Sequence, residues 1–190
     1  ANQMTNAINL WDLEYVTRAN VDFVQSASIN IDYSKLTLGK SSLLNIDANY
    51  TDINIGQVHD LINHIDYGNL TIQTVDVITN ASSYSNTKIE NLNSSFVFSG
   101  DYGSISINQI KKGFNKVSIG SDYVSVNLGI AKDAGYTLDG NFKYGTLSYP
   151  NTISMSKEIQ KGTSSSFTGK AGNGGGEILL NMTYGNAKIK

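Results

Sequence analysis

The chain has 190 residues, of which 39% are hydrophobic and 16% are charged, with a formal net charge of −2. This length predicts one domain, residues 1–190, that can bury a hydrophobic core. The weak charge excludes an electrostatic basis for binding nucleic acid or anionic membranes. The absence of cysteine excludes disulfides, thiolate metal sites and thiol catalysis.

The sequence also bears on targeting. No apolar run approaches the roughly 20 residues that a membrane-spanning helix needs, so no transmembrane segment is expected. The residues contain no signal peptide, and the first residue is Ala1 rather than Met. An export signal could have been removed or left out of this sequence. We expect an exported protein, located outside the cell or in the cell envelope.

Residues 1–23 are the least regular part of the chain. Trp11, Leu13 and Tyr15 alternate with polar residues, and Val21 and Phe23 alternate again. This alternation favours two short strands over a helix. We expect an irregular N-terminal turn or cap.

From residue 27 a repeat organises the sequence. The phrase Asp66–Ile72 (DYGNLTI) returns as Asp101–Ile107 (DYGSISI) and, with looser matches, along the chain. Its tyrosines are separated by 17, 17, 17, 18, 21, 21 and 40 residues. They are Tyr33, Tyr50, Tyr67, Tyr84, Tyr102, Tyr123, Tyr144 and Tyr184.

Aligning the repeats on tyrosine shows three apolar columns, at six residues before and at three and five residues after it. A polar column separates the last two, as period-two strands with one buried face require. Its members are Thr37, Asn54, Thr71, Lys88, Ser106, Asn127, Ser148 and Lys188. The inward parity also shifts by one residue at each tyrosine. We expect the small residue after it, such as Gly68 or Thr51, to absorb this shift with a positive φ.

A unit of about 17 residues is too short for a strand and a crossover helix. Stacked units of short strands instead predict an all-β fold, a right-handed single-stranded β-solenoid (β-helix) of eight to nine turns with 17–21 residues each. The tyrosines would then form a stacked file along one edge, which fills the edge of the core and leaves its hydroxyls in water.

The C-terminal part departs from the repeat after Pro150. Residues 152–159 predict a strand, and residues 161–176 a mobile loop or wide hairpin rich in glycine and serine. Residues 150–176 are thus expected as an irregular turn with a Gly-rich loop, and residues 177–190 as the final turn. Lys188 and Lys190 would blunt the open edge of that last turn.

The Tyr-Gly phrases and this ending resemble a family of adhesin-like proteins of the bacterial cell envelope. The similarity is strongest at Lys143–Gly145, Tyr149-Pro150, Lys161-Gly162 and Thr183–Ile189, and it covers residues 27–190. The resemblance implies a β-solenoid in an exported or surface protein of unknown function. It implies no catalytic residues.

Three groups of side chains are candidates for a sugar-binding or metal site. The tyrosine file could bind sugars by stacking, although a structural role is favoured. His59 and His64, with Asp60 and Asp66 nearby, are expected to be exposed rather than metal-ligating. The acids before tyrosine could form a ladder that recruits a cation, although an exposed polar corner is favoured. With Asn49 and Ser83, this ladder would comprise Asp32, Asp66, Asp101 and Asp122.

Other sequence motifs give weaker evidence of a functional site. Gly169-Lys170-Ala171 lacks the spacing and the hydroxyl of a phosphate-binding loop. No Gly-x-Ser-x-Gly elbow is present. Five glycosylation sequons matter only in a host that glycosylates, and they begin at Asn49, Asn69, Asn80, Asn93 and Asn181.

The sequence thus favours a non-catalytic structural or adhesive module of the cell envelope or surface, without cofactor, metal or assigned site residues. Its partner would be an extracellular glycan or protein. The alternative is a carbohydrate-active parallel β-helix, a polysaccharide lyase or glycoside hydrolase, with carboxylates grouped in a groove. A third hypothesis is ice binding through the polar column, which Lys88 and Lys188 interrupt.

Overall fold

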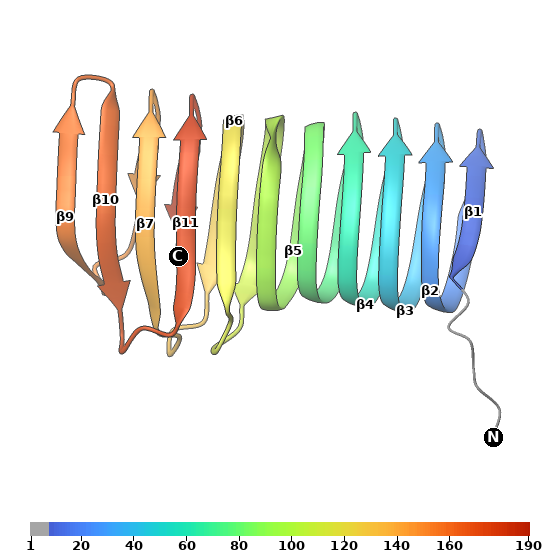
Figure 1. Ribbon diagram of the computed structural model, residues 1–190, viewed down its shortest axis with the longest axis horizontal. Helices are drawn as coiled ribbons and strands as arrows, with labels where there is room; N and C mark the ends of the chain where they lie inside the picture. Colours follow the sequence, from blue (N-terminus) through green and yellow to red (C-terminus); the bar gives the residue numbers. More distant parts are fainter. Residues whose placement is uncertain (1–7) are drawn as a thin grey trace.

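The computed structural model describes residues 8–190 and shows an all-β solenoid of about seven turns without helices (Figure 1). The expected all-β solenoid is confirmed, with about seven turns instead of the expected eight to nine. All twelve strands belong to one continuous sheet that coils along the long axis. Among the described residues, no helix is long and apolar enough to cross a membrane.

Most strands follow the chain around a turn. The twelve are β1 (Asn9–Glu14), β2 (Ala19–Asp32), β3 (Lys35–Asn49), β4 (Asp52–Asp66), β5 (Asn69–Ile110), β6 (Lys116–Ile130), β7 (Tyr136–Lys143), β8 (Thr146–Ser148), β9 (Ile153–Lys161), β10 (Ser164–Ala171), β11 (Gly176–Thr183) and β12 (Asn186–Ile189). Strands β1 to β6 pair in parallel with their sequence neighbours. Leu36 thus lies beside Ile53, and Ile53 beside Leu70, at the offset of 17 residues that the repeat predicts.

The core follows the apolar columns. All seven residues of the column six before tyrosine are buried, from Leu44 to Ile178. Thr87 and Ala187, which fit their column poorly, are buried as well. Two columns end in half-buried residues, Leu147 and Tyr149, where the repeat gives way to the C-terminal part. One continuous core therefore runs through the solenoid.

The N-terminal segment is more regular than expected. Strand β1 pairs in parallel with the second half of β2, with Glu14 beside Asp32. The register then shifts by one residue, because Ala19 lies beside Leu36. This extra residue hides the repeat in the sequence. Residues 8–23 thus form part of a regular first turn, whereas residues 1–7 lie outside the described part of the chain.

The C-terminal part corrects the expected order of turns. Strand β11 does not follow at the end but lies between β6 and β7, and β12 lies between β6 and β8. Lys188 is therefore inside the sheet, and the prediction that it blunts an open edge was wrong. Figure 1 shows β11, in red, inserted between the two earlier strands.

Residues 150–176 also differ from the expected irregular turn with a loop. Strands β9 and β10 form an antiparallel hairpin, and β10 pairs antiparallel with β7. The predicted strand at 152–159 is confirmed as β9, and half of residues 161–176, expected as a mobile loop or wide hairpin, is the strand β10. The hairpin ends the solenoid at the side opposite β1 (Figure 1).

Candidate functional site

The most regular surface feature is a ladder of nine tyrosines. Neighbouring rings lie 4.6 to 5.1 Å apart between centroids, with interplanar angles of 3° to 8°. In spatial order the tyrosine ladder comprises Tyr15, Tyr33, Tyr50, Tyr67, Tyr84, Tyr102, Tyr123, Tyr184 and Tyr144. The predicted stacked file is confirmed, but its rings are exposed on the surface and do not fill the edge of the core as expected. Tyr15 is an additional rung that the sequence did not reveal.

Every tyrosine of the ladder has a left-handed backbone, with φ between 49° and 58°. The expected positive φ at the following small residue was wrong, because no such angle occurs at Gly68, Gly103, Gly145 or Gly185. The tyrosine itself absorbs the parity shift and turns outward beside its preceding polar residue. This conformation costs about 1–2 kcal/mol for a residue with a Cβ. Each stacked pair contributes about 0.5–1.5 kcal/mol, so the stacking along the ladder offsets part of that cost.

Most of the ladder tyrosines are followed by a small residue that allows close contact between adjacent turns, and the exceptions are Val16 and Val124. The Thr51 hydroxyl donates to the carbonyl of Asn49 at 2.9 Å and accepts the Ser34 N–H at 3.4 Å. At Gly68 a Cβ would lie 2.2 Å from the carbonyl oxygen of Thr51, so the backbones approach too closely for a side chain. Small residues are thus selected here for space and hydrogen bonding.

The stacking restricts how the ladder can bind. The rungs are 42% to 70% exposed, but each interior ring is covered on both faces by its neighbours. A pyranose therefore cannot stack on an interior rung, and the ladder offers ring edges and hydroxyls instead. At one end, Tyr144 borders a hollow of about 250 Å³ that Gln160, Gly162 and Ser164 also line. Lys143 Nζ lies 5.6 Å from its ring centroid.

The polar column before tyrosine mixes acids with amides and hydroxyls. Asp32 Oδ1 accepts the backbone N–H of Asn49 at 3.0 Å and its side-chain amide at 2.9 Å. Asp66 Oδ1 likewise accepts the N–H of Ser83 at 3.0 Å. Asn49 thus separates the carboxylates of Asp32 and Asp66, which reduces their repulsion, whereas Glu14 lies directly beside Asp32.

Two further acids of this column, Asp101 and Asp122, lie side by side in register. Among the described residues, no group of three or more His, Cys, Asp or Glu side chains could hold a metal ion. The arrangement therefore shows paired acids but no set of ligands for the cation that a continuous ladder would recruit.

Both histidines are exposed, as expected, and each lies between two carboxylates. His59 Nδ1 hydrogen-bonds Asp76 of the next turn, and its Nε2 lies 3.7 Å from Asp60. The hydrogen bond to Asp76 raises the pKa of His59, with Asp60 adding to the effect. His64 Nδ1 lies 3.2 Å from Asp47. The sequence missed Asp47 and Asp76 because these partners come from neighbouring turns, 17 residues away.

A buried polar ladder also crosses turns. The Asn63 amide donates to Asn80 Oδ1 at 2.8 Å, and the Asn80 amide donates to the Thr87 hydroxyl at 2.8 Å. Both asparagines stand in a column that is otherwise apolar, and both are fully buried. Asn80 is one of the five sequon residues, so its side chain is inaccessible to glycosylation in the folded protein.

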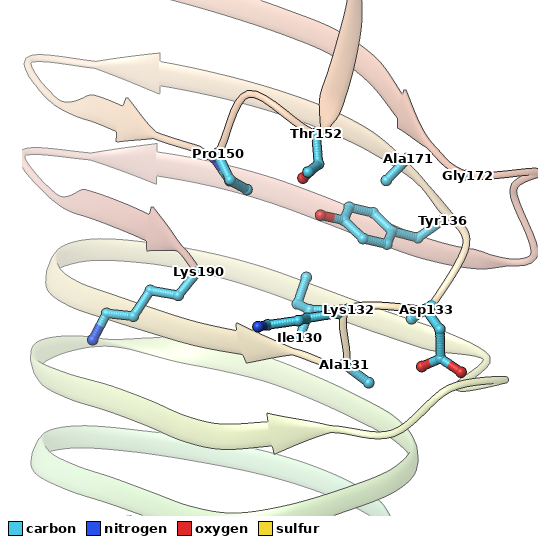
Figure 2. A pocket seen from close by; sticks show the side chains of 11 residues that line it. Ile130, Ala131, Lys132, Asp133, Tyr136, Pro150, Thr152, Ala171, Gly172 and Lys190 are labelled. Atoms are coloured by element: carbon cyan, nitrogen blue, oxygen red, sulfur yellow. The ribbon is translucent and has the colours of Figure 1, made fainter.

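A pocket of about 390 Å³ opens where the repeat gives way to the C-terminal part (Figure 2). Ile130, Ala131 and Ala134 form one wall, and Pro150 and Ala171 another. The ring of Tyr136 lies across the pocket with its hydroxyl directed into it, and Lys132, Asp133 and Lys190 lie at the rim. We refer to this as the junction pocket. No motif in the sequence indicates this pocket, because the residues of its walls come together only when the C-terminal strands are inserted.

Glycines allow close backbone contacts beside the junction pocket. A Cβ on Gly135 would lie 2.3 Å from the carbonyl oxygen of Gly174, and the N–H of Gly176 donates to the carbonyl of Gly135 at 3.0 Å. Gly172, Gly174 and Gly175 have positive φ, which lets the chain reverse from β10 into β11. The Gly-rich stretch is thus a turn that brings the backbone of residues 172–176 against Gly135.

No family model matches the chain, and neither a curated protein nor a solved structure matches it.

Proposed function

We propose that this chain is a non-catalytic module of the bacterial cell envelope or surface, with a structural or adhesive role. The observation that carries the proposal is the periodic surface. Nine tyrosines and the polar columns beside them repeat the same groups at the spacing of the strands. A surface of this kind suits an extended partner, a glycan chain or a protein segment, better than a single small substrate.

The energetics support an extended partner. A rung offers a phenol edge and hydroxyl beside one or two polar side chains, and a hydrogen bond to such groups contributes about 0.5–1.5 kcal/mol net. One rung therefore binds weakly, but several rungs that engage one polymer add up, as in other multivalent contacts. The resemblance of residues 27–190 to adhesin-like envelope proteins agrees with this role and with export.

The test uses variants that keep the stacking. Tyr50→Phe, Tyr67→Phe and Tyr84→Phe together remove three neighbouring hydroxyls and leave the rings in place. Wild type and the triple variant would be applied to a glycan array and to a panel of bacterial polysaccharides. We expect binding to an extended glycan that the triple variant weakens about tenfold or more. Tyr149→Phe, outside the ladder, is the matched control and should leave binding unchanged.

Two results would overturn the proposal. The first is release of reducing or unsaturated ends from a polysaccharide, abolished by a single carboxylate substitution, which would establish the carbohydrate-active alternative. The second is equal binding by wild type and the triple variant, which would remove the tyrosine ladder from the interaction. A Tyr144→Phe variant separates a contact at the end hollow from one along the ladder, because only the former should respond to it.

A further inference from the structure

The junction pocket has properties that the periodic surface does not explain. It is the one place described above where an apolar hollow, a tyrosine hydroxyl without a protein partner and lysines without an ion pair within residues 8–190 come together. Its volume of about 390 Å³ is at the lower end of the range for small-molecule sites. We propose that the junction pocket binds a small molecule with an apolar body and one carboxylate, an aryl or short alkyl carboxylate. This inference is independent of the proposed surface role.

The walls determine the body of the ligand. Ile130, Ala131, Ala134, Pro150 and Ala171 present hydrocarbon, and the ring of Tyr136 adds an aromatic face. Such walls favour a flat or linear apolar group and disfavour a sugar, whose hydroxyls would lose their hydrogen bonds to water. The walls are also held together by the backbone contacts of Gly135 with the 172–176 turn. A preformed pocket binds without a large cost in ordering.

Tyr136 supplies a donor inside the pocket. The residue is only 4% exposed as a whole, and its hydroxyl makes no hydrogen bond to another of residues 8–190. The hydroxyl is not one of the fully buried atoms that lack a partner, so it faces the open pocket, where a ligand can reach it. Burial raises the pKa of Tyr136, so the phenol stays protonated and can donate to an acceptor such as a carboxylate oxygen.

The rim determines the charge of the ligand. Lys132 and Lys190 take part in no salt bridge within the described part of the chain, whereas Asp133 pairs with Lys112 at 3.1 Å. The one acid of the rim is thus neutralised from outside, and two cations remain at the mouth. In Figure 2 the Lys190 side chain extends away from Tyr136, so Lys132 is the cation nearer the opening. A carboxylate at the mouth would face Lys132, with a longer-range attraction from Lys190, while its apolar body lies against the walls.

The proposal is tested by titrating the ¹⁵N-labelled full chain and following its amide resonances. Sodium benzoate and sodium hexanoate are the two probes, benzyl alcohol is the neutral control, and inorganic phosphate is the anion without an apolar body. We expect saturable shifts confined to residues 130–136, 151–152 and 171–172 with the two carboxylates. Benzyl alcohol should bind about tenfold more weakly, and phosphate should cause no saturable shift.

Variants separate the contributions of the groups. Lys132→Gln with Lys190→Gln should weaken benzoate about tenfold but leave benzyl alcohol unchanged, whereas Lys111→Gln, on a neighbouring exposed turn, is the matched control. Tyr136→Phe should weaken benzoate several-fold with the amide spectrum otherwise retained, which shows that the fold is intact. Equal binding of benzoate and benzyl alcohol, equal binding by the double lysine variant, or no saturable shift with either carboxylate would each overturn the proposal.

Discussion

The regular coils of residues 8–130 and the C-terminal part of residues 131–190 follow different rules of assembly. In the coils each turn lies beside the next turn in sequence, so that Leu36 lies beside Ile53. In the C-terminal part, Ile178 lies between Val117 and Leu138, so the chain returns to fill a place that it had passed. The sequence repeat describes the contents of each turn but does not determine the order in which turns stack.

The tyrosine ladder shows that the two parts obey the same local physics. Tyr184 stacks between Tyr123 and Tyr144 at 4.7 and 4.6 Å, with nearly parallel rings, although it comes last in the chain. The inserted turn therefore satisfies the same stacking and register as its neighbours. The two parts differ in how the parallel stack of strands continues. In the C-terminal part, the β9–β10 hairpin pairs with the outer edge of β7 and ends the parallel stack.

The largest expected effect comes from removing a core side chain in each part. Leu44 and Leu180 are both fully buried, and replacement by alanine should lower the free energy of unfolding by about 2–5 kcal/mol in either case. In Leu180→Ala, however, β11 and its neighbours should open separately, because β11 alone joins β6 to β7. Hydrogen exchange would then show lost protection mainly in residues 131–190.

Leu44→Ala is the matched control for this comparison, because it alters a turn held by sequence neighbours on both sides. Its loss of protection should centre on β2 to β4. Urea unfolding measures the free energy of unfolding of each variant. The hydrogen-exchange pattern shows which strands lose protection. If Leu180→Ala reduced protection evenly over the whole solenoid, the two parts would form one cooperative unit, and the comparison would fail.

The next effect concerns the corner that both parts share. Tyr67→Ala removes two stacked contacts and leaves a left-handed residue with a Cβ, so we expect a loss of about 1–3 kcal/mol. Tyr67→Gly removes the same contacts but relieves the backbone cost, so it should be about 1 kcal/mol more stable than the alanine variant. Thermal and urea unfolding measure both. Alanine equal to or better than glycine would contradict the role assigned to the left-handed tyrosine.

The third effect tests the junction directly. A Cβ on Gly176 would lie 2.5 to 2.7 Å from three atoms of the Phe114 ring, so Gly176→Ala should cost about 1–3 kcal/mol by overpacking. The same change at Gly120, in the regular coils, meets nothing closer than a carbonyl oxygen at 4.0 Å. Gly120→Ala should therefore stay within about 0.5 kcal/mol of wild type. Equal stabilities would show that Phe114 moves aside without cost.

The sequence predicts the coils well because their information is local and periodic. The spacing of tyrosines and the apolar columns is sufficient for register, core and ladder. It fails at Tyr15, where one inserted residue before Ala19 hides the repeat, and at the corner, where glycine suggests the wrong residue for the positive φ. Gly68 is needed for the approach of Thr51, and a sequence does not distinguish this need from backbone freedom.

The candidate sites were less predictable for the same reason. Asp76 meets His59, and Tyr136 meets Ala171, only after turns or hairpins have been placed in space. The return of β11 depends on contacts between residues about 40 to 60 positions apart, such as Ile178 with Leu138 and Val117. No repeat encodes such contacts, so the junction pocket was invisible in the sequence.

The smallest expected effect lies on the surface of the coils. The raised pKa of His59 means that its pairing with Asp76 contributes stability below about pH 6.5 and loses it as the pH rises through the folded-state value. For Asp76, partial burial acts to raise the pKa, but the hydrogen bonds from His59 and Asn93 hold it below its usual range. The contribution of Asp76 is therefore present above about pH 3.8 and is lost as the pH falls through its lowered value.

The pair should thus stabilise the coils most near about pH 5, and because both groups are partly exposed, by at most about 1 kcal/mol. The measurement is a double-mutant cycle of His59→Ala and Asp76→Asn by urea unfolding at a series of pH values. We expect the coupling energy to peak between the two pKa values and to vanish above about pH 8. A coupling that is constant with pH would mean that the contact between His59 and Asp76 is a neutral hydrogen bond.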